Sequence, residues 1–404
     1  MHDPITGYAG VDWATDTHAI CVVNDQGAIV DEGEVANTAD GLAELCRRVR
    51  RAGAARVAIE RPDGPVVDAV LAAGLEVVVV SSRSVKALRE RYGTAGNKSD
   101  RGDAYVLADC LRTDGHRWRS LEPDSPATVT LRSHVRARKD LVETRVATAN
   151  QLRAHLRVVF PGAVGLFKSI DSPISLRFLA RFPSATSAGW LSDKRLGSWL
   201  RANGYSGRRS ATELHARLSD APGGLTGDEG DARGSVTLAY VEILGALRAQ
   251  IDELDARLAE LLDAHPDAHI FRSLPRCATV RAATLLAEIG DCRARFPDAE
   301  SLCCLAGVAP STRSSGRHRA VTFRFSSDTK LRNAICDFAG DSWRGNTWAE
   351  HRYRELRNAG KSHPHAERIL ARSWTHIIWR CWQDGVTYDP TRHGAHQRLT
   401  AATG

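Results

Sequence analysis

The stretch that decides the fold runs from Tyr8 to Asn37, "YAGVDWATDTHAICVVNDQGAIVDEGEVAN". It contains three short runs rich in β-branched residues, and the turn sequence "NDQG" separates the second run from the third. Apolar runs bounded by turn residues predict three short β-strands with tight connections. One acidic residue, Asp12, lies inside the first predicted strand.

The next segments alternate between helix and strand. We expect a helix over 39–51, a strand in "ARVAIERP", a helix in "PVVDAVLAAG" that ends at Gly74, and a fifth strand in "LEVVVVSS". The last of these is wholly apolar in its centre, which is typical of a strand buried on both faces. The predicted order is βββαβαβα, and Glu60 ends the fourth strand.

The final helix of this series begins in "GNKSDRGDAYVLADCLR", residues 96–112, with Asp100 and Asp103 in its first turn. Two interpretations remain open. Acidic residues in a first turn favour the positive end of the helix dipole, and Ser99 is a suitable N-cap. Alternatively, residues three apart project from one side of a helix, so both carboxylates can reach one metal ion.

Composition and charge indicate a multidomain protein that binds a polyanion. The chain has 404 residues, 43% of them hydrophobic, which favours two or three domains. Its 55 Lys and Arg against 48 Asp and Glu give a net charge of +7. Residues 1–120 carry 15 basic and 18 acidic groups, net −3, whereas residues 313–380 carry 14 and 6, net +8. The excess positive charge therefore lies outside the N-terminal region, as expected if a later segment holds a polyanion.

The cysteines and the hydropathy pattern indicate a cytoplasmic protein. Nine cysteines occur without a CxxC pair, so we expect reduced core thiols rather than disulfides or a zinc ribbon. No apolar run is long enough to span a membrane, and the first residues lack a basic-then-apolar signal pattern. We therefore expect no membrane partner.

A long basic helix is predicted from Ser125 to Pro161. Residues 132–157 carry seven basic and two acidic side chains, net +5. Arg132, Arg136 and Lys139 fall on one stripe of this helix, at i, i+4 and i+7. The stripe is either a solvated face or a surface that tracks phosphates, and we predict that it binds nucleic acid together with Arg153.

A heptad seam follows in "LGALRAQIDELDARLAELL", residues 244–262. Its apolar positions alternate in steps of three and four: Leu244, Leu247, Ile251, Leu254, Leu258 and Leu261. This spacing predicts a coiled coil that assembles the protein into a homo-oligomer, a dimer or a tetramer. The alternative is an amphipathic helix packed on its own domain, because fewer than four heptads are present.

Motifs along most of the chain carry a family resemblance. The strand and helix order, with its acids, resembles the RNase H-like (RuvC-like) fold of resolvases and transposases. The sequence as a whole resembles the DEDD insertion-sequence transposases, a family of bridge-RNA-guided serine recombinases that also includes the pilin-gene invertases. The matching stretches are "GVDWATDTHAICVVNDQG", "AIERPDG", "NKSDRGDAYVLAD", "NQLRAHLRVVFP", "TLLAEIGD" and "RFPDAESLCCLAGVAPSTRSSG".

The resemblance implies a metal site formed by four acids, Asp12, Glu60, Asp100 and Asp103. A single pair of carboxylates about 4 Å apart costs roughly 4 kcal/mol at an effective dielectric near 20, and a divalent cation removes this repulsion. Oxygen-only, carboxylate-rich sites suit Mg²⁺ or Mn²⁺. Paired ions in such a site can polarise a phosphodiester.

The resemblance also implies a nucleophilic serine before a glycine in "STRSSGRHR". Ser315 is the better match, and Ser314 is its alternative. A serine hydroxyl needs activation. The surrounding cations Arg313, Arg317 and Arg319 are suited to hold a scissile phosphate, whereas without the family match a flexible basic loop would be the simpler interpretation.

Three departures from the family pattern stand out. Thr15 replaces a lysine that is frequent in the first motif. The family's "PGIG" turn is here "PRCATV", residues 275–280, which removes both glycines and puts phosphate binding by backbone amides at this turn in doubt. Arg317 replaces the usual second glycine after the serine motif.

We thus predict an α/β RNase H-like catalytic domain over residues 1–122, a basic helical linker with a coiled coil over 123–265, a mainly α transposase domain over 266–390, and a disordered tail over 391–404. The predicted function is a recombinase that cuts and rejoins target and donor DNA under the guidance of an RNA. Two alternatives are a junction resolvase or metal-dependent nuclease that uses water, and a non-catalytic scaffold that binds RNA or DNA.

Overall fold

The computed structural model describes residues 7–92, 99–315, 318–394 and 397. It divides into two compact units, Met1–Pro123 and Asp124–Gly404, which are considered separately. The other predicted domain boundaries, at residues 265 and 390, fall inside the second unit and stay predictions. Most of the tail predicted to be disordered, 391–404, lies outside the described residues.

The first unit is built on a mixed five-stranded sheet, as predicted. The strands are β1 (Gly7–Trp13), β2 (Thr17–Val23), β3 (Ile29–Ala36), β4 (Ala54–Ile59) and β5 (Glu76–Val79). Their order across the sheet is β3-β2-β1-β4-β5. The first three strands form an antiparallel meander, while β1, β4 and β5 run parallel, so β1 and β4 are neighbours.

The helices of this unit lie on the two faces of the sheet. They are α1 (Ala39–Arg51), α2 (Pro65–Ala72), α3 (Ser82–Arg89) and α4 (Asp100–Asp114). The sequence pattern predicts all of them except α3. Residues of β1, β2 and β4 pack with α1 and α2 on one face, and α3 and α4 share clusters with the opposite face.

One glycine sets how closely α4 approaches the sheet. A Cβ atom added to Gly10, in β1, would lie 2.2 Å from the carbonyl oxygen of Ala104 and 2.4 Å from the amide nitrogen of Ala108. Ala104 and Ala108 are themselves fully buried. The backbones of β1 and α4 are thus in direct contact, which only small residues on both sides permit.

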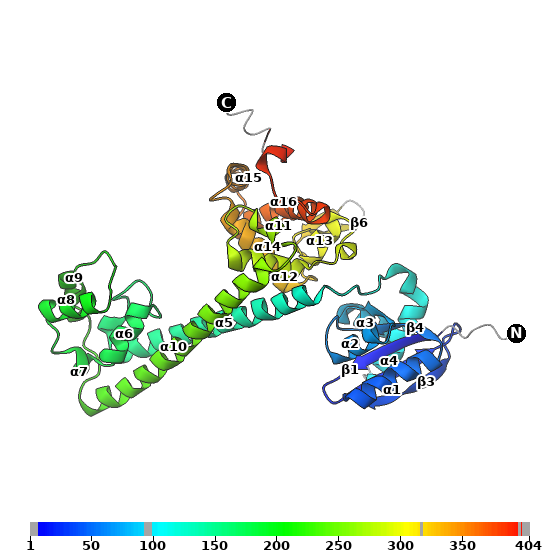
Figure 1. Ribbon diagram of the computed structural model, residues 1–404, viewed down its shortest axis with the longest axis horizontal. Helices are drawn as coiled ribbons and strands as arrows, with labels where there is room; N and C mark the ends of the chain where they lie inside the picture. The colour runs from blue at the N-terminus through cyan, green and yellow to red at the C-terminus, as the bar shows by residue number, and fades with distance from the viewer. Residues whose placement is uncertain (1–6, 93–98, 316–317, 395–396, 398–404) are drawn as a thin grey trace. The chain divides into compact units, whose positions relative to one another are not determined.

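The second unit contains two long helices that run side by side, α5 (Pro126–Val159) and α10 (Gly227–Asp263) (Figure 1). The predicted heptad seam of α10 packs here within the chain: Leu244 shares a cluster with Leu152 of α5, and Leu258 shares one with Leu131. A helix of the same chain therefore fills this part of the seam. Assembly of an oligomer through α10 stays a prediction.

A helical lobe and a larger helical domain lie at opposite ends of this hairpin (Figure 1). The lobe contains α6 (Pro173–Arg181), α7 (Ala185–Ala188), α8 (Asp193–Ala202) and α9 (Ala211–Ser219). The domain contains α11 (Ala268–Arg272), α12 (Thr279–Ile289), α13 (Ala299–Leu305), α14 (Thr329–Ser342), α15 (Thr347–Asn358), α16 (His363–Asp384) and a hairpin of β6 (Ser311–Ser315) and β7 (His318–Thr322).

The core of the C-terminal domain is rich in tryptophan. Trp374 and Trp382, both on α16, are fully buried, and their indole N–H groups donate to Ser342 Oγ and to the carbonyl oxygen of Gly290. Buried indoles usually need such a partner.

Within the described part of the chain, no helix combines the length and apolar character needed to cross a membrane.

A buried histidine connects the end of α10 to the start of α5. His265, just after α10, is 4% exposed, and its Nε2 lies 2.9 Å from Thr128 Oγ1 in α5. Its Nδ1 accepts the backbone N–H of Asp267 at 3.1 Å. Both ring nitrogens are therefore used by the neutral imidazole, and burial lowers the pKa of His265 below its ordinary value.

We predict that Gly10→Ala destabilises the first unit by roughly 3 kcal/mol or more, because α4 must move away from the sheet. Full-length protein should show a lower unfolding midpoint and faster hydrogen exchange in β1 and α4. The matched control is Gly245→Ala on α10, where an added Cβ meets nothing within 4 Å. This control should be neutral or stabilising by about 1 kcal/mol. Equal effects of the two substitutions would contradict the close-contact interpretation.

We further predict that the second unit loses stability as the pH falls through about 6.5, the ordinary pKa of histidine. The unfolded chain takes up a proton there that folded His265 resists, so its contribution is complete above this pH and declines below it. Urea midpoints at neutral and mildly acidic pH measure the effect. His265→Gln should show a smaller loss, and an identical pH dependence in both proteins would exclude His265 as its source.

Candidate functional site

Two of the predicted acids lie at neighbouring strand ends. The parallel register pairs Gly10 with Ala58 and Val11 with Ile59, and Asp12 and Glu60 directly follow the last of these pairs. Side chains two apart on a strand share a face. Asp12 therefore shares the face of Gly10, and Glu60 shares that of Ala58, which clusters with residues of α4. Both acids thus belong to the sheet face that α4 covers.

The other two acids lie in the first turn of α4, as predicted. Ser99 is the N-cap, and its hydroxyl accepts the backbone N–H of Gly102 at 3.1 Å. Asp100 is exposed, whereas Asp103 is 3% exposed. The capping interpretation of this sequence is therefore correct for Ser99, and the buried Asp103 requires a different partner.

Arg89 provides that partner. Its Nη2 and Nε lie 2.5 Å and 2.7 Å from Asp103 Oδ1, and it reaches α4 from the end of α3. A buried carboxylate needs a compensating charge. Sequence reasoning missed Arg89, because α3 was not predicted and the two residues are 14 positions apart without a recognisable spacing.

The four acids offer the type of ligand atom that a divalent cation prefers, but their carboxylates are not gathered around one point. All four offer hard carboxylate oxygens, and Asp103 already holds one positive charge in the form of a guanidinium. They are not gathered into one ligand cluster among the described residues, and Asp12 has an interaction of its own. To bind a metal ion here, Asp103 must either give up its ion pair with Arg89 or contact Arg89 and the metal ion together.

One other group of metal-ligand types does gather in the described chain. The ligand atoms of Glu300, Cys303 and His376 all lie within 4.8 Å of one another. However, Glu300 accepts two hydrogen bonds from Arg372 at 3.0 and 3.2 Å, and burial raises the pKa of Cys303 to about 12. A carboxylate that is already paired and a protonated thiol make a poor metal site.

Asp109 is a second buried acid on α4, and it has a structural role. It is 4% exposed; Tyr92 donates its hydroxyl to one carboxylate oxygen and Arg112 Nε lies 2.7 Å from the other. Arg112 also donates to the carbonyl oxygen of Asp25 at 3.1 Å, which ties α4 to the turn after β2.

The predicted nucleophiles lie on a β-hairpin rather than in an irregular loop. Ser314 and Ser315 are the last two residues of β6, and both are exposed. Their Cα partners on β7 are Arg319 and His318, respectively. Consecutive residues of a strand point to opposite faces, so the two hydroxyls cannot serve one site from the same side.

Two residues of the basic stripe of α5, Arg132 and Arg136, are paired within the protein. Arg132 is ion-paired with Asp124 and donates to the carbonyl oxygen of Ala287 at 2.6 Å. Arg136 makes two hydrogen bonds, at 2.8 and 3.1 Å, to Glu288, which is 5% exposed. These arginines attach α5 to the C-terminal domain. Both arginines are half-buried, and the predicted contact of this stripe with nucleic acid stays a prediction.

The other residues predicted to contact nucleic acid have weaker contacts within the protein or lie outside the described residues. Lys139 reaches Glu143 only at 4.0 Å, and Arg153 bonds to Asn150 on its own helix. Arg317 lies outside the described residues, as do the side chains of Arg313 and Arg319. Their contacts with nucleic acid stay predictions.

The turn that lacks the family's glycines keeps a glycine-like backbone. Arg276 is the only described non-glycine residue with a positive φ, 55°. Its guanidinium Nε lies 3.0 Å from Asp341 Oδ2, which Arg281 also contacts at 2.9 Å. A favourable ion pair therefore accompanies a backbone conformation that usually costs a non-glycine residue about 1 kcal/mol or more.

Two family models match the chain. A model of DEDD transposases of the IS110 type, described as "Transposase", matches residues 9–161, which include all four acids. A second model, described as "Transposase IS116/IS110/IS902 family", matches residues 268–354, which include both serines. Residues 162–267 lie between the two matches.

Proteins of mobile elements are similar over most of the chain. A mini-circle transposase for IS117 of Streptomyces coelicolor is 32% identical, with 96% of this chain and 97% of the relative covered. The insertion element IS900 protein of Mycobacterium paratuberculosis is 26% identical, with 96% and 98% covered. The insertion element IS110 protein of Streptomyces coelicolor is 29% identical, with 78% of each covered.

We predict that Arg89→Gln creates a Mg²⁺-dependent gain in stability. Without metal, the substitution leaves Asp103 buried and uncompensated, so the melting temperature should fall. Added Mg²⁺ should then restore most of the loss, because the cation no longer competes with a guanidinium for the carboxylate. Thermal unfolding with and without Mg²⁺ measures both effects.

The matched control is Arg112→Gln. Its ion pair with Asp109 has nearly the same side-chain exposure, 26% and 6%, as that of Arg89 with Asp103, 28% and 4%. Arg112→Gln should also lower the melting temperature, but Mg²⁺ should not restore it. Equal responses of the two variants to Mg²⁺ would show that Asp103 is not part of a metal site.

Proposed function

Because the chain belongs to the IS110 family of insertion-sequence transposases, we propose that it cuts and rejoins DNA through a metal-dependent four-acid site and a serine nucleophile. The observation that carries the proposal is the arrangement of the acids in the first unit. Asp12 lies near the end of β1, Glu60 directly follows the neighbouring parallel strand β4, and Asp100 and Asp103 lie in the first turn of the helix that covers one face of these strands. Family membership implies the reaction class, DNA phosphoryl transfer.

Asp12, Glu60, Asp100 and Asp103 would hold Mg²⁺ or Mn²⁺. A divalent cation bound there supplies positive charge that polarises the phosphodiester and stabilises the departing oxygen. The chain's own part is to hold oxygen ligands on rigid elements. β1 and β4 position two of them, and the contact of Gly10 with α4 positions the others.

Ser315 is the proposed nucleophile. Its Oγ attacks the phosphorus of a DNA phosphodiester, so a bond from serine to phosphorus forms while the bond from phosphorus to a deoxyribose oxygen breaks. The freed sugar hydroxyl takes up the proton that the serine loses. Because the number of phosphoester bonds is unchanged, attack by another sugar hydroxyl can reverse the step and rejoin DNA.

The proposed partners are target DNA, donor DNA and a guide RNA. Base pairing with an RNA would carry sequence choice and leave the protein to bind backbone and shape. We also propose a homo-oligomer, a dimer or a tetramer. It is supported by the apolar side chains that α10 leaves exposed, Val236 at 43% and Ile243 at 50%.

Two other functions make different predictions. A nuclease or junction resolvase that uses water needs the four acids but not Ser315. A scaffold that only binds RNA or DNA needs neither. The match over 97% of a transposase relative and the presence of all four acids favour the recombinase.

We predict that a reaction stopped midway leaves DNA covalently joined to the peptide "STRSSGR". Ser315→Ala should abolish this adduct and reduce strand joining by at least about a thousandfold, because removing a nucleophile leaves only weak residual catalysis. DNA binding should survive, since the surrounding cations remain. Denaturing gels and mass spectrometry of the peptide measure the adduct.

Ser314→Ala is the control, since its hydroxyl points to the other face of β6 and should be dispensable. If the adduct instead persists in Ser315→Ala and disappears in Ser314→Ala, the nucleophile is the neighbouring residue. If wild-type protein cuts DNA without any adduct, water is the nucleophile.

Asp12→Asn should stop DNA cleavage whether serine or water is the nucleophile, because it removes a hard oxygen ligand without much change of shape.

A further inference from the structure

The helical lobe at the far end of the α5–α10 hairpin carries a surplus of positive charge. Residues 161–226 contain nine Lys and Arg and four Asp and Glu, net +5. Nearly all of this segment lies in the gap between the two family matches. Its charge therefore needs an explanation separate from the four-acid site and the serine hairpin.

None of the nine basic side chains has an ion pair among the described residues, and all nine are exposed: Lys168, Arg177, Arg181, Lys194, Arg195, Arg201, Arg208, Arg209 and Arg217. Two of the four acids of the lobe pair with residues other than these nine. Asp171 pairs with Arg145 of α5 at 3.4 Å, and Asp193 pairs with His215 at 2.8 Å. The lobe thus presents positive charge that the fold does not neutralise, unlike the paired arginines at the start of α5.

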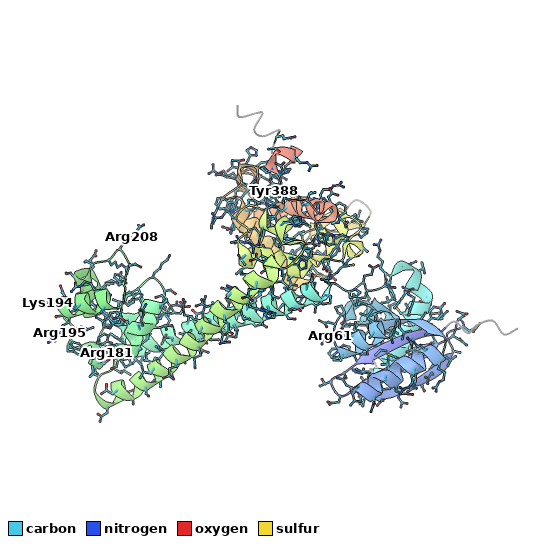
Figure 2. The ribbon with its side chains drawn as sticks, in the orientation of Figure 1. Arg61, Arg181, Lys194, Arg195, Arg208 and Tyr388 are labelled. Atoms are coloured by element: carbon cyan, nitrogen blue, oxygen red, sulfur yellow. The ribbon has the colours of Figure 1, made fainter. Side chains whose placement is uncertain are left out.

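An exposed tryptophan lies within this charge. Trp190 has 48% of its surface exposed, whereas the other eight tryptophans, all in the described chain, are buried or half-buried. The guanidinium carbons of Arg181 and Arg195 lie 5.9 and 5.1 Å from the centroid of its ring. Figure 2 shows Arg181, Lys194 and Arg195 together on one outer edge of the lobe.

Trp190 is held in place and remains about half exposed. Phe182, fully buried, lies against it with ring centroids 5.9 Å apart. Arg195 Nη1 donates to the carbonyl oxygen of Trp190 at 2.7 Å, which fixes the backbone next to the ring. Such an indole is positioned in advance for a flat ligand, so little conformational entropy is lost when one binds.

A ligand that satisfies both features carries regularly spaced anions and flat aromatic groups. Single-stranded nucleic acid has this chemistry, since its phosphates match the arginines and its unstacked bases can stack on the indole. A duplex offers the phosphates but keeps its bases inside. An acidic protein surface offers charge without a flat aromatic face.

We propose that the edge of the lobe formed by Trp190, Arg181, Lys194 and Arg195 binds an unpaired stretch of nucleic acid, with one base stacked on Trp190. The strand is either a loop of an RNA or a DNA strand exposed during recombination, and the two share this chemistry. The inference requires neither the metal site nor the serine nucleophile of the proposed function.

The test uses full-length protein in EDTA with labelled oligonucleotides of about 12 nucleotides, within the usual site size of such surfaces. The probes are oligo-U RNA, oligo-dT DNA and a DNA duplex of equal length. Photocrosslinking of 5-bromouridine RNA should map to the peptide that contains Trp190. Trp190→Ala should weaken single-strand binding roughly tenfold or more, because one stacked base is lost.

Replacing Arg181, Lys194 and Arg195 together with Gln should lower the slope of log affinity against log salt by up to about 2 for single strands. The matched control removes three other arginines that already have acidic partners, the exposed Arg257 and Arg354 and the half-buried Arg352. This control should change the slope much less, although its change in net charge is the same.

The comparison of RNA with DNA identifies which strand the lobe prefers, and tighter binding of either one than of the duplex supports the proposal. Three results would overturn it. They are equal binding of single strands and duplex, an unchanged affinity in Trp190→Ala, and equal effects of the lobe and control triple substitutions. Because no cleavage is measured, failure here leaves the proposed catalytic site untouched, and failure of the serine adduct leaves this site untouched.

Discussion

The first unit depends on the contact between the backbones of β1 and α4 at Gly10. A side chain at this position would overlap the carbonyl oxygen of Ala104, so α4 could not lie flat on the sheet. The same contact brings the first turn of α4, with Asp103, to the face on which β1 carries Asp12. Packing in this unit therefore also positions the acids, so a change that moves α4 away from β1 would disturb the geometry of the proposed site.

Arginine has two distinct uses in this protein, and the distinction follows from the supply of acids nearby. Arg89, Arg132 and Arg136 each face a buried or nearly buried carboxylate, and these pairs fasten one element to another. Leaving either member alone in such a site would be costly. In the lobe, Asp171 and Asp193 pair with Arg145 and His215, and the nine arginines and lysines of this segment form no ion pair among the described residues, so they remain available to an outside polyanion. Local pairing, rather than the net charge of a segment, therefore determines which basic residues keep an uncompensated charge.

Most of the fold of the first unit could be predicted from sequence, because strand alternation and turn residues are local signals. The bounds predicted for the helix at 39–51 agree with α1, and the predicted strand and helix order agrees with the observed one apart from α3. The partners of the arginines could not be predicted, since Glu288 is 152 residues from Arg136 and only the tertiary fold brings them together. The heptad seam could not reveal its partner either, because a helix of the same chain and one of another chain demand the same spacing. Trp190 had no signal in the sequence, where an exposed and a buried tryptophan look alike.

The length of the helical hairpin fixes the distance between the lobe and the C-terminal domain. A helix of 34 residues is about 51 Å long at 1.5 Å per residue, and α5 spans that length between the lobe and the C-terminal domain. Duplex DNA rises about 3.4 Å per base pair, so this arm is as long as about 15 base pairs. A single nucleic acid that follows the arm and touches both of its ends must be at least that long, whatever its sequence. The two antiparallel helices, packed along their length, would thus set a minimum substrate size by geometry alone.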